Sequence, residues 1–212
     1  MNINDLRIKL LTQELNHSEL EADPIKQFER WYQQTTDSDM HEPGAMTLAT
    51  VDATGQPWQR VVLLKMFDEE GFVFFTNYES RKAQQIENNP NVSLSFPWHS
   101  IGRQIMITGT AEKISAAESL KYFATRPRGS QLGAWASKQS QMISTRSMLE
   151  TMVDSMKKKF ANHEVPLPPF WGGYRVSPKT IEFWQARESR LHDRFIYSKN
   201  AEGEWNSERL AP

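Results

Sequence analysis

The spacing of apolar residues changes along the chain, and each change predicts a different kind of structure. Residues 4–15 and 23–36 are mostly polar, with apolar positions three or four apart, such as Ile25, Phe28 and Trp31. This spacing predicts amphipathic helices. In the following part of the chain, apolar residues gather in short runs that predict β-strands. The chain therefore begins with helices and continues into a region rich in strands.

Hairpins and helices alternate through the rest of the sequence. Two strand-like runs within residues 46–67 flank the turn signal Asp-Ala-Thr-Gly-Gln. Further strands are expected at 72–77, 91–98, 103–114, 174–176, 180–184, 190–198 and after the turn at 200–204, and further helices at 80–90, 115–127 and 144–160. The helix after Ser115 opens with a capping box completed by Glu118. Consecutive hairpins interrupted by helices favour one α+β domain built on an antiparallel barrel or strongly curved sheet.

The composition narrows the class of protein. Hydrophobic residues make up 38% of the 212 residues, which is enough to build a core. The formal net charge is −1, so a general affinity for nucleic acid is not indicated, although a local basic patch stays open. The chain has no cysteine, no apolar stretch near the ~20 residues that span a bilayer, and no signal-peptide pattern at its start. We therefore expect a cytoplasmic protein that binds neither nucleic acid nor membrane.

A cluster of cations near the C-terminus is the first candidate site. Residues 187–195 read RESRLHDRF. If this segment is a strand, alternation places Arg190, His192 and Arg194 on one face, where they could bind an anion, and leaves Arg187 at the surface. The alternative is a solvated strand face with surface ion pairs.

Other cations lie at points where an anion could bind. Arg81 and Lys82 stand in the first turn of a predicted helix, where backbone N–H groups favour a phosphate. Tyr122 and Arg126 are four residues apart on another predicted helix and therefore share a face, with Ser130 close behind. The alternatives are a charged surface turn and a half-buried amphipathic helix.

A lysine inside an apolar run is the last candidate. Lys65 follows four aliphatic residues and could reach a ligand or extend into solvent. Arg60 and Lys65 have opposite parity, so both can face one side of a strand only if a bulge intervenes. Together the cations suggest two phosphate-sized sites near aromatic residues.

Metal chemistry is not indicated, because the five histidines are scattered without a ligand spacing. Gly-rich nucleotide-binding motifs and a Gly-x-Ser-x-Gly elbow are also missing from the sequence.

Seven segments in collinear order closely resemble the pyridoxamine 5′-phosphate oxidase family. They cover much of the chain from about residue 24 to its end, and are residues 59–65, 74–90, 95–98, 122–140, 168–176, 181–195 and 209–212. The resemblance implies an α+β fold with an antiparallel split β-barrel surrounded by helices. It also implies a homodimer with FMN in two sites at the subunit interface. Residues 1–22 would form an N-terminal segment that could move, and residues 23–212 one FMN-binding domain.

The resemblance further implies an activity in vitamin B6 metabolism. Pyridoxine 5′-phosphate and pyridoxamine 5′-phosphate would be oxidised to pyridoxal 5′-phosphate, with O₂ reduced to H₂O₂. The FMN-binding residues would be Arg60, Val61, Val62, Leu63, Leu64, Lys65, Phe75, Thr76, Arg81, Lys82, Gln104, Gln139, Ser140, Trp184 and Arg194, several of them from the partner subunit. The substrate would be bound by Lys65, Tyr122, Arg126, Ser130, Arg190 and His192. Arg190 and His192 would be catalytic, with orientation of the substrate preferred to proton abstraction as the role of His192.

The sequence departs from the family pattern at two positions. Phe75 stands where the family commonly has tyrosine, so a contact through a tyrosine hydroxyl would be lost. Leu10 stands where a family Arg-x-x-Tyr lid segment would place tyrosine, so a lid role for residues 7–10 is not expected. The competing classes are another split-barrel flavin oxidoreductase, a non-enzymatic protein that binds flavin or pyridoxal phosphate, and an RNA-binding protein with a basic patch.

Overall fold

The computed structural model describes residues 2–212, which form a mixed α and β structure around an antiparallel sheet. The strands are β1 (Ala45–Val51), β2 (Pro57–Leu63), β3 (Met66–Asp68), β4 (Gly71–Asn77), β5 (Asn91–Phe96), β6 (Arg103–Lys113), β7 (Trp171–Gln185), β8 (Asp193–Lys199) and β9 (Trp205–Arg209). Over the described range this nine-stranded sheet has the order β2-β1-β5-β6-β7-β4-β3, with β8 beside β7 and β9 beside β8. The predicted antiparallel α+β architecture is therefore confirmed.

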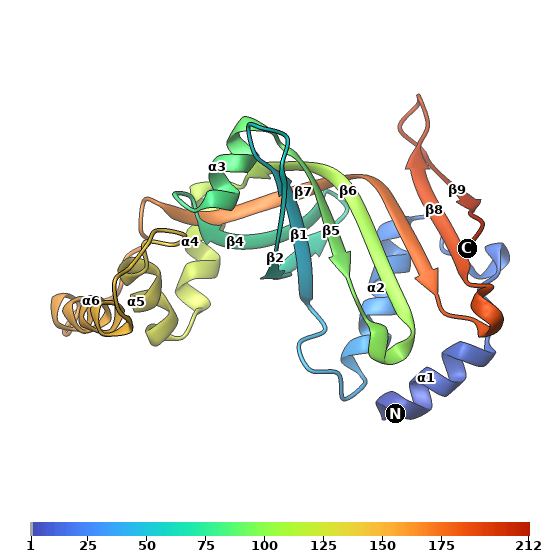
Figure 1. Ribbon diagram of the computed structural model, residues 1–212, viewed down its shortest axis with the longest axis horizontal. Helices are drawn as coiled ribbons and strands as arrows, with labels where there is room; N and C mark the ends of the chain where they lie inside the picture. The colour runs from blue at the N-terminus through green and yellow to red at the C-terminus, as the bar shows by residue number, and fades with distance from the viewer. Residues whose placement is uncertain (1) are drawn as a thin grey trace.

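Six α-helices and three short 3₁₀ turns surround the sheet within residues 2–212. They are α1 (Ile3–Thr12), α2 (Pro24–Thr36), α3 (Arg81–Asn88), α4 (Ala116–Thr125), α5 (Arg128–Ala136) and α6 (Arg146–Lys159), with short 3₁₀ turns η1 (His17–Glu19), η2 (His99–Ile101) and η3 (Glu188–Arg190). In Figure 1, α4, α5 and α6 lie together at one end of the molecule, whereas α1, β8 and β9 lie at the other. The two ends carry different groups of the predicted site residues.

Local sequence signals account for the boundaries of several elements. The Asp-Ala-Thr-Gly-Gln turn joins β1 to β2, whose closing pair is Val51 with Pro57. The side chain of Ser80 caps α3 by accepting a hydrogen bond from the Ala83 amide. At α4 the predicted capping box forms between Ser115 and Glu118. These predictions are confirmed because each depends on neighbours in the sequence.

The longest strand corrects one prediction. The sequence predicts separate strands at 174–176 and 180–184, but β7 runs without a break through 15 residues. A register shift between Thr108 and Gly109 on β6 accommodates Pro178 opposite. At Gly109 a Cβ atom would stand 2.2 Å from the Ser177 carbonyl oxygen, so this close approach requires glycine. β7 therefore crosses the whole sheet and pairs with β4 over its first part and β8 over its last.

Aromatic side chains form the centre of the core. Phe28 of α2 is fully buried and makes edge contacts with Phe72 and Phe96 of the sheet. A smaller cluster, which includes Phe123 and Trp171, packs beneath the helices at the other end. Leu10 of α1 is 4% exposed and packs within the main core.

Candidate functional site

A cavity of about 280 Å³ opens between β2, β4 and the helices α3 and α4. Most of its lining comes from residues that the sequence singled out. The lining consists of Val61, Val62, Leu63, Lys65, Phe75, Thr76, Lys82, Tyr122, Arg126, Gln139 and Trp171. Residues up to 110 positions apart in the sequence thus surround one space that is rich in cations and aromatic rings.

Lys82 lines this cavity and is held there by hydrogen bonds. It lies in the first turn of α3, its side chain is buried, and its Nζ donates to Gln139 Oε1 (2.8 Å) and Thr76 Oγ1 (3.2 Å). Thr76 in turn donates to the same Gln139 oxygen (2.9 Å). Burial lowers the pKa of Lys82 to about 8, and repulsion from Arg60 adds to this effect. Lys82 is therefore a desolvated cation whose partners are neutral oxygens.

Arg60 fixes the position of β2 next to Lys82. Its Nη1 donates to the Leu48 carbonyl (3.2 Å) and its Nη2 donates to Gln85 Oε1 (3.3 Å) of α3. Burial lowers the pKa of Arg60, with a smaller contribution from Arg81. Arg81 itself lies outside the cavity lining, with its guanidinium 4.4 Å from the centre of the Trp58 ring. The helix-start cations predicted from the sequence therefore cluster as expected, although only Lys82 lines the cavity.

Arg126 is another cation that lines the cavity. Its Nη1 is buried without a hydrogen-bond partner among the described residues, and its guanidinium lies 4.7 Å from the centre of the Trp171 ring. Burial lowers the pKa of Arg126. A buried donor without a partner is unfavourable, because it loses water and gains nothing in return. Arg126 is thus a cation that an incoming anion would satisfy.

Three stacked aromatic rings line the same cavity. Phe75 stacks on Tyr122, with ring centres 4.0 Å apart, and on Trp171 at 5.2 Å. Burial raises the pKa of Tyr122 and keeps its hydroxyl protonated. Since Phe75 contributes its ring face here, the stack forms without a hydroxyl group at that position.

Two local predictions about this region need correction. Tyr122 and Arg126 do not share a helix face, because α4 ends at Thr125 and Arg126 is the extended residue that follows. Both side chains nevertheless reach the cavity. The strand-parity argument does not apply to Lys65, because β2 ends at Leu63. The Lys65 amide instead bonds to the Val73 carbonyl (2.9 Å) of β4.

A second group of predicted residues lies across three neighbouring strands. Gln104 of β6 pairs with Trp184 of β7, and Trp184 pairs with Arg194 of β8. All three side chains are partly exposed. Arg194 donates from Nε to Glu182 Oε1 (2.8 Å), and this bond raises the pKa of Arg194. The pairing places an indole, an amide and a guanidinium in one row on the sheet.

The segment before β8 differs from the predicted strand. Glu188–Arg190 forms a 3₁₀ turn in which Ser189 and Arg190 have positive φ angles of 54° and 61°. The prediction that Arg190, His192 and Arg194 alternate on one strand is therefore wrong, since β8 begins only at Asp193. Non-glycine residues in this conformation are strained, and such strain tends to occur at functional positions.

His192 still joins the row of residues on the strands. Its ring centre is 4.6 Å from that of Trp184, and its Nδ1 accepts a hydrogen bond from the Arg187 amide (3.1 Å). Arg187 is not a free surface residue, because its Nη1 donates to the Leu11 carbonyl (3.1 Å) and its Nε lies 3.7 Å from Asp193. Arg190 is exposed beside this row.

The chain does not bring the two groups together. The cavity lining includes none of Gln104, Trp184, Arg190, His192 and Arg194. α4 borders the cavity at one end of the molecule, whereas β8 lies at the other (Figure 1). Two other predicted residues, Ser130 and Ser140, are exposed outside the lining.

Comparisons with known protein families decide the relationship. A family model described as "Pyridoxamine 5'-phosphate oxidase" matches residues 33–160, and one described as "Pyridoxine 5'-phosphate oxidase C-terminal dimerisation region" matches residues 171–212. The chain belongs to the pyridoxamine 5′-phosphate oxidase family. The resemblance seen in the sequence is therefore confirmed.

Members of this family match the whole chain. A pyridoxine/pyridoxamine 5'-phosphate oxidase of Crocosphaera subtropica is 56% identical over 214 residues, covering 100% of both proteins. A protein of the same name from Shewanella sediminis is 57% identical over 211 residues, covering 99% of each. The similarity is spread over both groups of candidate residues.

Solved structures of the family have the same fold. PhzG from Burkholderia lata 383, determined with tetrahydrophenazine-1-carboxylic acid, superposes with a TM-score of 0.89 at 28% identity, covering 96% of this chain and 100% of PhzG. A pyridoxamine 5'-phosphate oxidase-related, FMN binding protein from Nostoc punctiforme gives a TM-score of 0.72 at 18% identity, covering 89% and 97%. At that identity the second match supports the fold alone.

Sequence reasoning gave no role to Trp171, although it lines the cavity and contacts Arg126. The signal that could have found it is the Trp-Gly-Gly run that it begins. A Cβ atom on Gly172 would stand 2.1 Å from the Tyr78 hydroxyl oxygen, and one on Gly173 would stand 3.0 Å from the Phe75 ring. Gly173 thus lets Phe75 of the aromatic stack approach the strand closely, and Gly172 makes room for Tyr78.

Two further observations concern membrane proteins and metal-binding proteins. No helix within residues 2–212 is long and apolar enough to cross a membrane. Across the same residues, no group of three or more histidine, aspartate or glutamate side chains is placed to hold a metal ion.

Proposed function

We propose that this protein is an FMN-dependent oxidase that converts pyridoxamine 5′-phosphate and pyridoxine 5′-phosphate to pyridoxal 5′-phosphate. O₂ is reduced to H₂O₂, and the amine substrate also takes up water and releases ammonia. The observation that carries this proposal is a cavity lined by two cations, the buried Lys82 and the half-buried Arg126, whose Nη1 is buried without a partner. No carboxylate of residues 2–212 lies within 4.0 Å of either side-chain nitrogen. Two uncompensated cations fit two phosphate groups.

The residues around Lys82 would bind the phosphate of FMN. Lys82 and Thr76 already direct their donors at one shared oxygen, that of Gln139, and the same donors would serve a phosphate oxygen. The backbone at the start of α3 adds N–H groups, and Arg81 adds charge nearby. The side chains of Val61, Val62 and Leu63 line the cavity beside Lys65, and Arg60 secures their strand, whereas Leu64 is buried in the core and would face FMN only through its backbone.

The residues around Arg126 would bind the phosphate of the substrate. Arg126 offers the unpartnered Nη1, and Tyr122 and Lys65 line the same space. A guanidinium and a phenol match a phosphate monoester, because both donate to its oxygens. Ser130, on the first turn of α5 nearby in sequence, would complete this site.

The remaining residues would come from a second copy of the chain. The dimerisation region matched at residues 171–212 contains Trp184, Arg190, His192 and Arg194. These side chains lie outside the cavity of their own chain, so a homodimer would bring them over the cavity of its partner, together with Gln104. In this arrangement the curved sheet of residues 23–212 is the split β-barrel domain, with residues 1–22 as an N-terminal segment.

Binding geometry is what the chain contributes to the reaction. FMN, when bound, would supply the redox chemistry by accepting a hydride from the substrate and passing electrons to O₂. Arg126 would anchor the substrate phosphate and so fix where the reacting carbon lies. Trp184 and the aromatic stack would shield the site from water. Arg190, exposed and without a partner among the described residues, would orient the substrate ring and stabilise its charge.

The hydrogen bond at His192 favours an orienting role over a basic one. Because Nδ1 accepts from the Arg187 amide, the neutral ring carries its proton on Nε2, which can only donate. His192→Asn preserves an acceptor and a donor, so kcat should fall by less than about tenfold and the pH profile should keep its shape. Steady-state kinetics over a range of pH measures both. Loss of kcat with unchanged KM would contradict this role.

The pKa of Lys82 predicts how FMN affinity depends on pH. Lys82 binds a phosphate only in its charged form, and its pKa without ligand is about 8. The contribution of Lys82 to FMN affinity should therefore be constant below about pH 8. Above pH 8 the affinity should fall, by up to about tenfold per pH unit. Flavin fluorescence titrations from pH 7 to 10 would measure the fall, and Lys82→Arg, which stays charged, should flatten it. An equal fall in both proteins would contradict the assignment.

The direct test of the activity uses the purified protein with FMN. The preparation should be yellow, and it should form pyridoxal phosphate from either substrate while consuming O₂. A flavin oxidoreductase of other specificity would bind FMN without forming this product. A protein that cannot be loaded with FMN would refute the proposal.

A further inference from the structure

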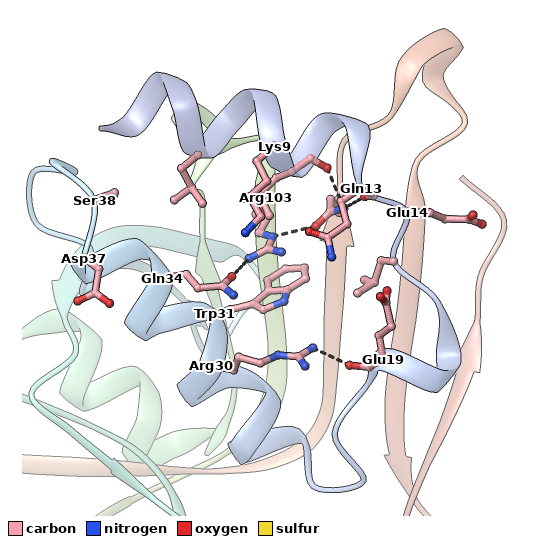
Figure 2. A pocket seen from close by; sticks show the side chains of 14 residues that line it. Lys9, Gln13, Glu14, Glu19, Arg30, Trp31, Gln34, Asp37, Ser38 and Arg103 are labelled. Carbon is pink, nitrogen blue, oxygen red and sulfur yellow. Dashed lines mark hydrogen bonds between the residues drawn. The ribbon is translucent and has the colours of Figure 1, made fainter. Parts of the chain in front are cut away.

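A second cavity, of about 350 Å³, lies beneath α1 at the opposite end of the chain. Its walls come from α1 and α2, and its floor from the first residue of β6 and the last residue of β7 (Figure 2). None of its lining residues belongs to the proposed flavin cavity or to the second group of candidate residues. The cavity therefore needs an explanation of its own.

Arg103 forms the floor of this cavity and is only 5% exposed. Its Nε donates to Gln185 Oε1 (2.9 Å) and its Nη1 donates to Gln34 Oε1 (2.6 Å). The guanidinium carbon lies 3.9 Å from the centre of the Trp31 ring. In Figure 2 the guanidinium projects between Gln34 and the end of α1.

Every partner of Arg103 is neutral. Within residues 2–212 no carboxylate oxygen lies within 4.0 Å of its guanidinium nitrogens, and its Nη2 makes no hydrogen bond. Burial, with a smaller contribution from Arg30, lowers the pKa of Arg103 to about 9, so the group is still charged at neutral pH. A buried cation without a counter-charge is costly, and side chains of this kind are usually paired.

The neutral partners cannot adapt to supply the missing charge. Gln185 donates from Nε2 to the carbonyls of Gln13 (2.7 Å) and Leu10 (3.1 Å) at the end of α1. These bonds fix the orientation of the amide and turn its oxygen toward Arg103. Nη2 of Arg103, which bonds to no described residue, is thus held in place by a network that also ties α1 to the sheet.

The other charged groups of the cavity lie at its rim. Glu14, Glu19 and Asp37 are exposed there, and none is paired with Arg103. Arg30 is already paired with Glu21 (3.2 Å). Lys9, in the last turn of α1, is exposed and forms no ion pair with a described residue. A ligand that enters between the rim residues would meet Lys9 first and Arg103 at the bottom.

We propose that the cavity beneath α1 is a binding site for a small oxyanion, in which an oxygen of a phosphate or carboxylate group accepts from Nη2 of Arg103. Guanidinium donors match the oxygens of both groups, and an anion would supply the counter-charge that the chain withholds. The volume is at the lower end of the range for ligand pockets, which favours a compact metabolite over a nucleotide or a peptide.

The position of the anion can be tested by crystallography of the unmodified full chain. Crystals soaked in selenate, a tetrahedral oxyanion with an anomalous signal, should show selenium within hydrogen-bond reach of Arg103 Nη2. A parallel soak in a brominated carboxylate distinguishes a planar from a tetrahedral ligand. Absence of both anions beside Arg103 would overturn the proposal, whatever is seen in the flavin cavity.

Affinity can be tested by calorimetric titration of the FMN-loaded Arg126→Ala protein with inorganic phosphate. This background keeps phosphate out of the proposed substrate site. Lys9→Glu should weaken phosphate binding by about tenfold, since an exposed cation at the rim becomes a repulsive anion without disturbing the core. Lys26→Glu, an exposed change of equal charge on α2 outside the cavity, is the matched control and should leave binding unchanged. Equal affinities in the two variants would overturn the proposal.

Discussion

Replacing Arg126 with alanine is expected to raise the KM for both phosphorylated substrates by about 10- to 100-fold, because a charge-assisted hydrogen bond contributes about 1.5–3 kcal/mol. Arg126 Nη1 is buried without a partner, so a substrate phosphate would be its first strong acceptor. FMN should stay bound, since its phosphate is assigned to Lys82 and Thr76 and not to Arg126. Steady-state kinetics and the flavin absorbance of the purified variant give the two measurements.

Two further variants sharpen this prediction. Lys121→Ala removes an exposed cation from α4, the helix that precedes Arg126, outside the cavity and should leave KM unchanged. Arg126→Lys keeps the charge but loses the planar contact with Trp171, so its KM should lie between those of the wild type and the alanine variant. If Arg126→Ala lost FMN and kept its KM, the two phosphate sites would have been assigned in the wrong order.

Replacing Lys82 with methionine is expected to weaken FMN binding by at least about 100-fold, because a buried phosphate contact with a lysine is lost. The stability of the FMN-free protein should not fall. Lys82 is desolvated among neutral oxygens, so removing its charge should leave the unfolding free energy unchanged or raise it. Flavin titration and urea unfolding of the FMN-free protein measure these two effects.

Comparing FMN affinity with stability distinguishes a role of Lys82 in binding from a role in folding. A side chain with a purely structural role would lower both the FMN affinity and the stability when it is replaced. Lys121→Met, an exposed replacement of the same type, controls for the loss of a charge and should change neither quantity. A large loss of stability in FMN-free Lys82→Met would show that the fold itself depends on the cation, and would contradict its assignment to the phosphate of FMN.

The sequence predicted those features that depend on neighbouring residues. The hairpin around residues 52–56 and the capping box at Ser115 form as expected, since turn and capping residues act within a few positions. The strand alternation proposed for residues 190–194 failed. Ser189 and Arg190 adopt positive φ angles without the glycine that would have indicated a turn there.

The site itself could be predicted only in part. The cations at Lys82 and Arg126 were identified from their local patterns, but their common cavity depends on β4, α3 and α4 meeting in three dimensions. Arg126 reaches that cavity from beyond the end of α4. Tyr122 and Arg126 therefore both line the cavity, but not because they share a helix face. The contact of Trp171 with Arg126 joins residues 45 positions apart and leaves no local signal other than the two glycines.

Each active site is expected to combine the Arg126 cavity of one chain with the Arg190 turn of another. Co-expressing Arg126→Ala and Arg190→Ala chains with different affinity tags allows the mixed dimer to be purified. One of its two sites would then be entirely wild type, so we expect about half of the wild-type activity, while each variant alone is strongly impaired. A mixed dimer no more active than the parent variants would contradict a site shared between chains, because it would mean that both residues serve the same site from one chain.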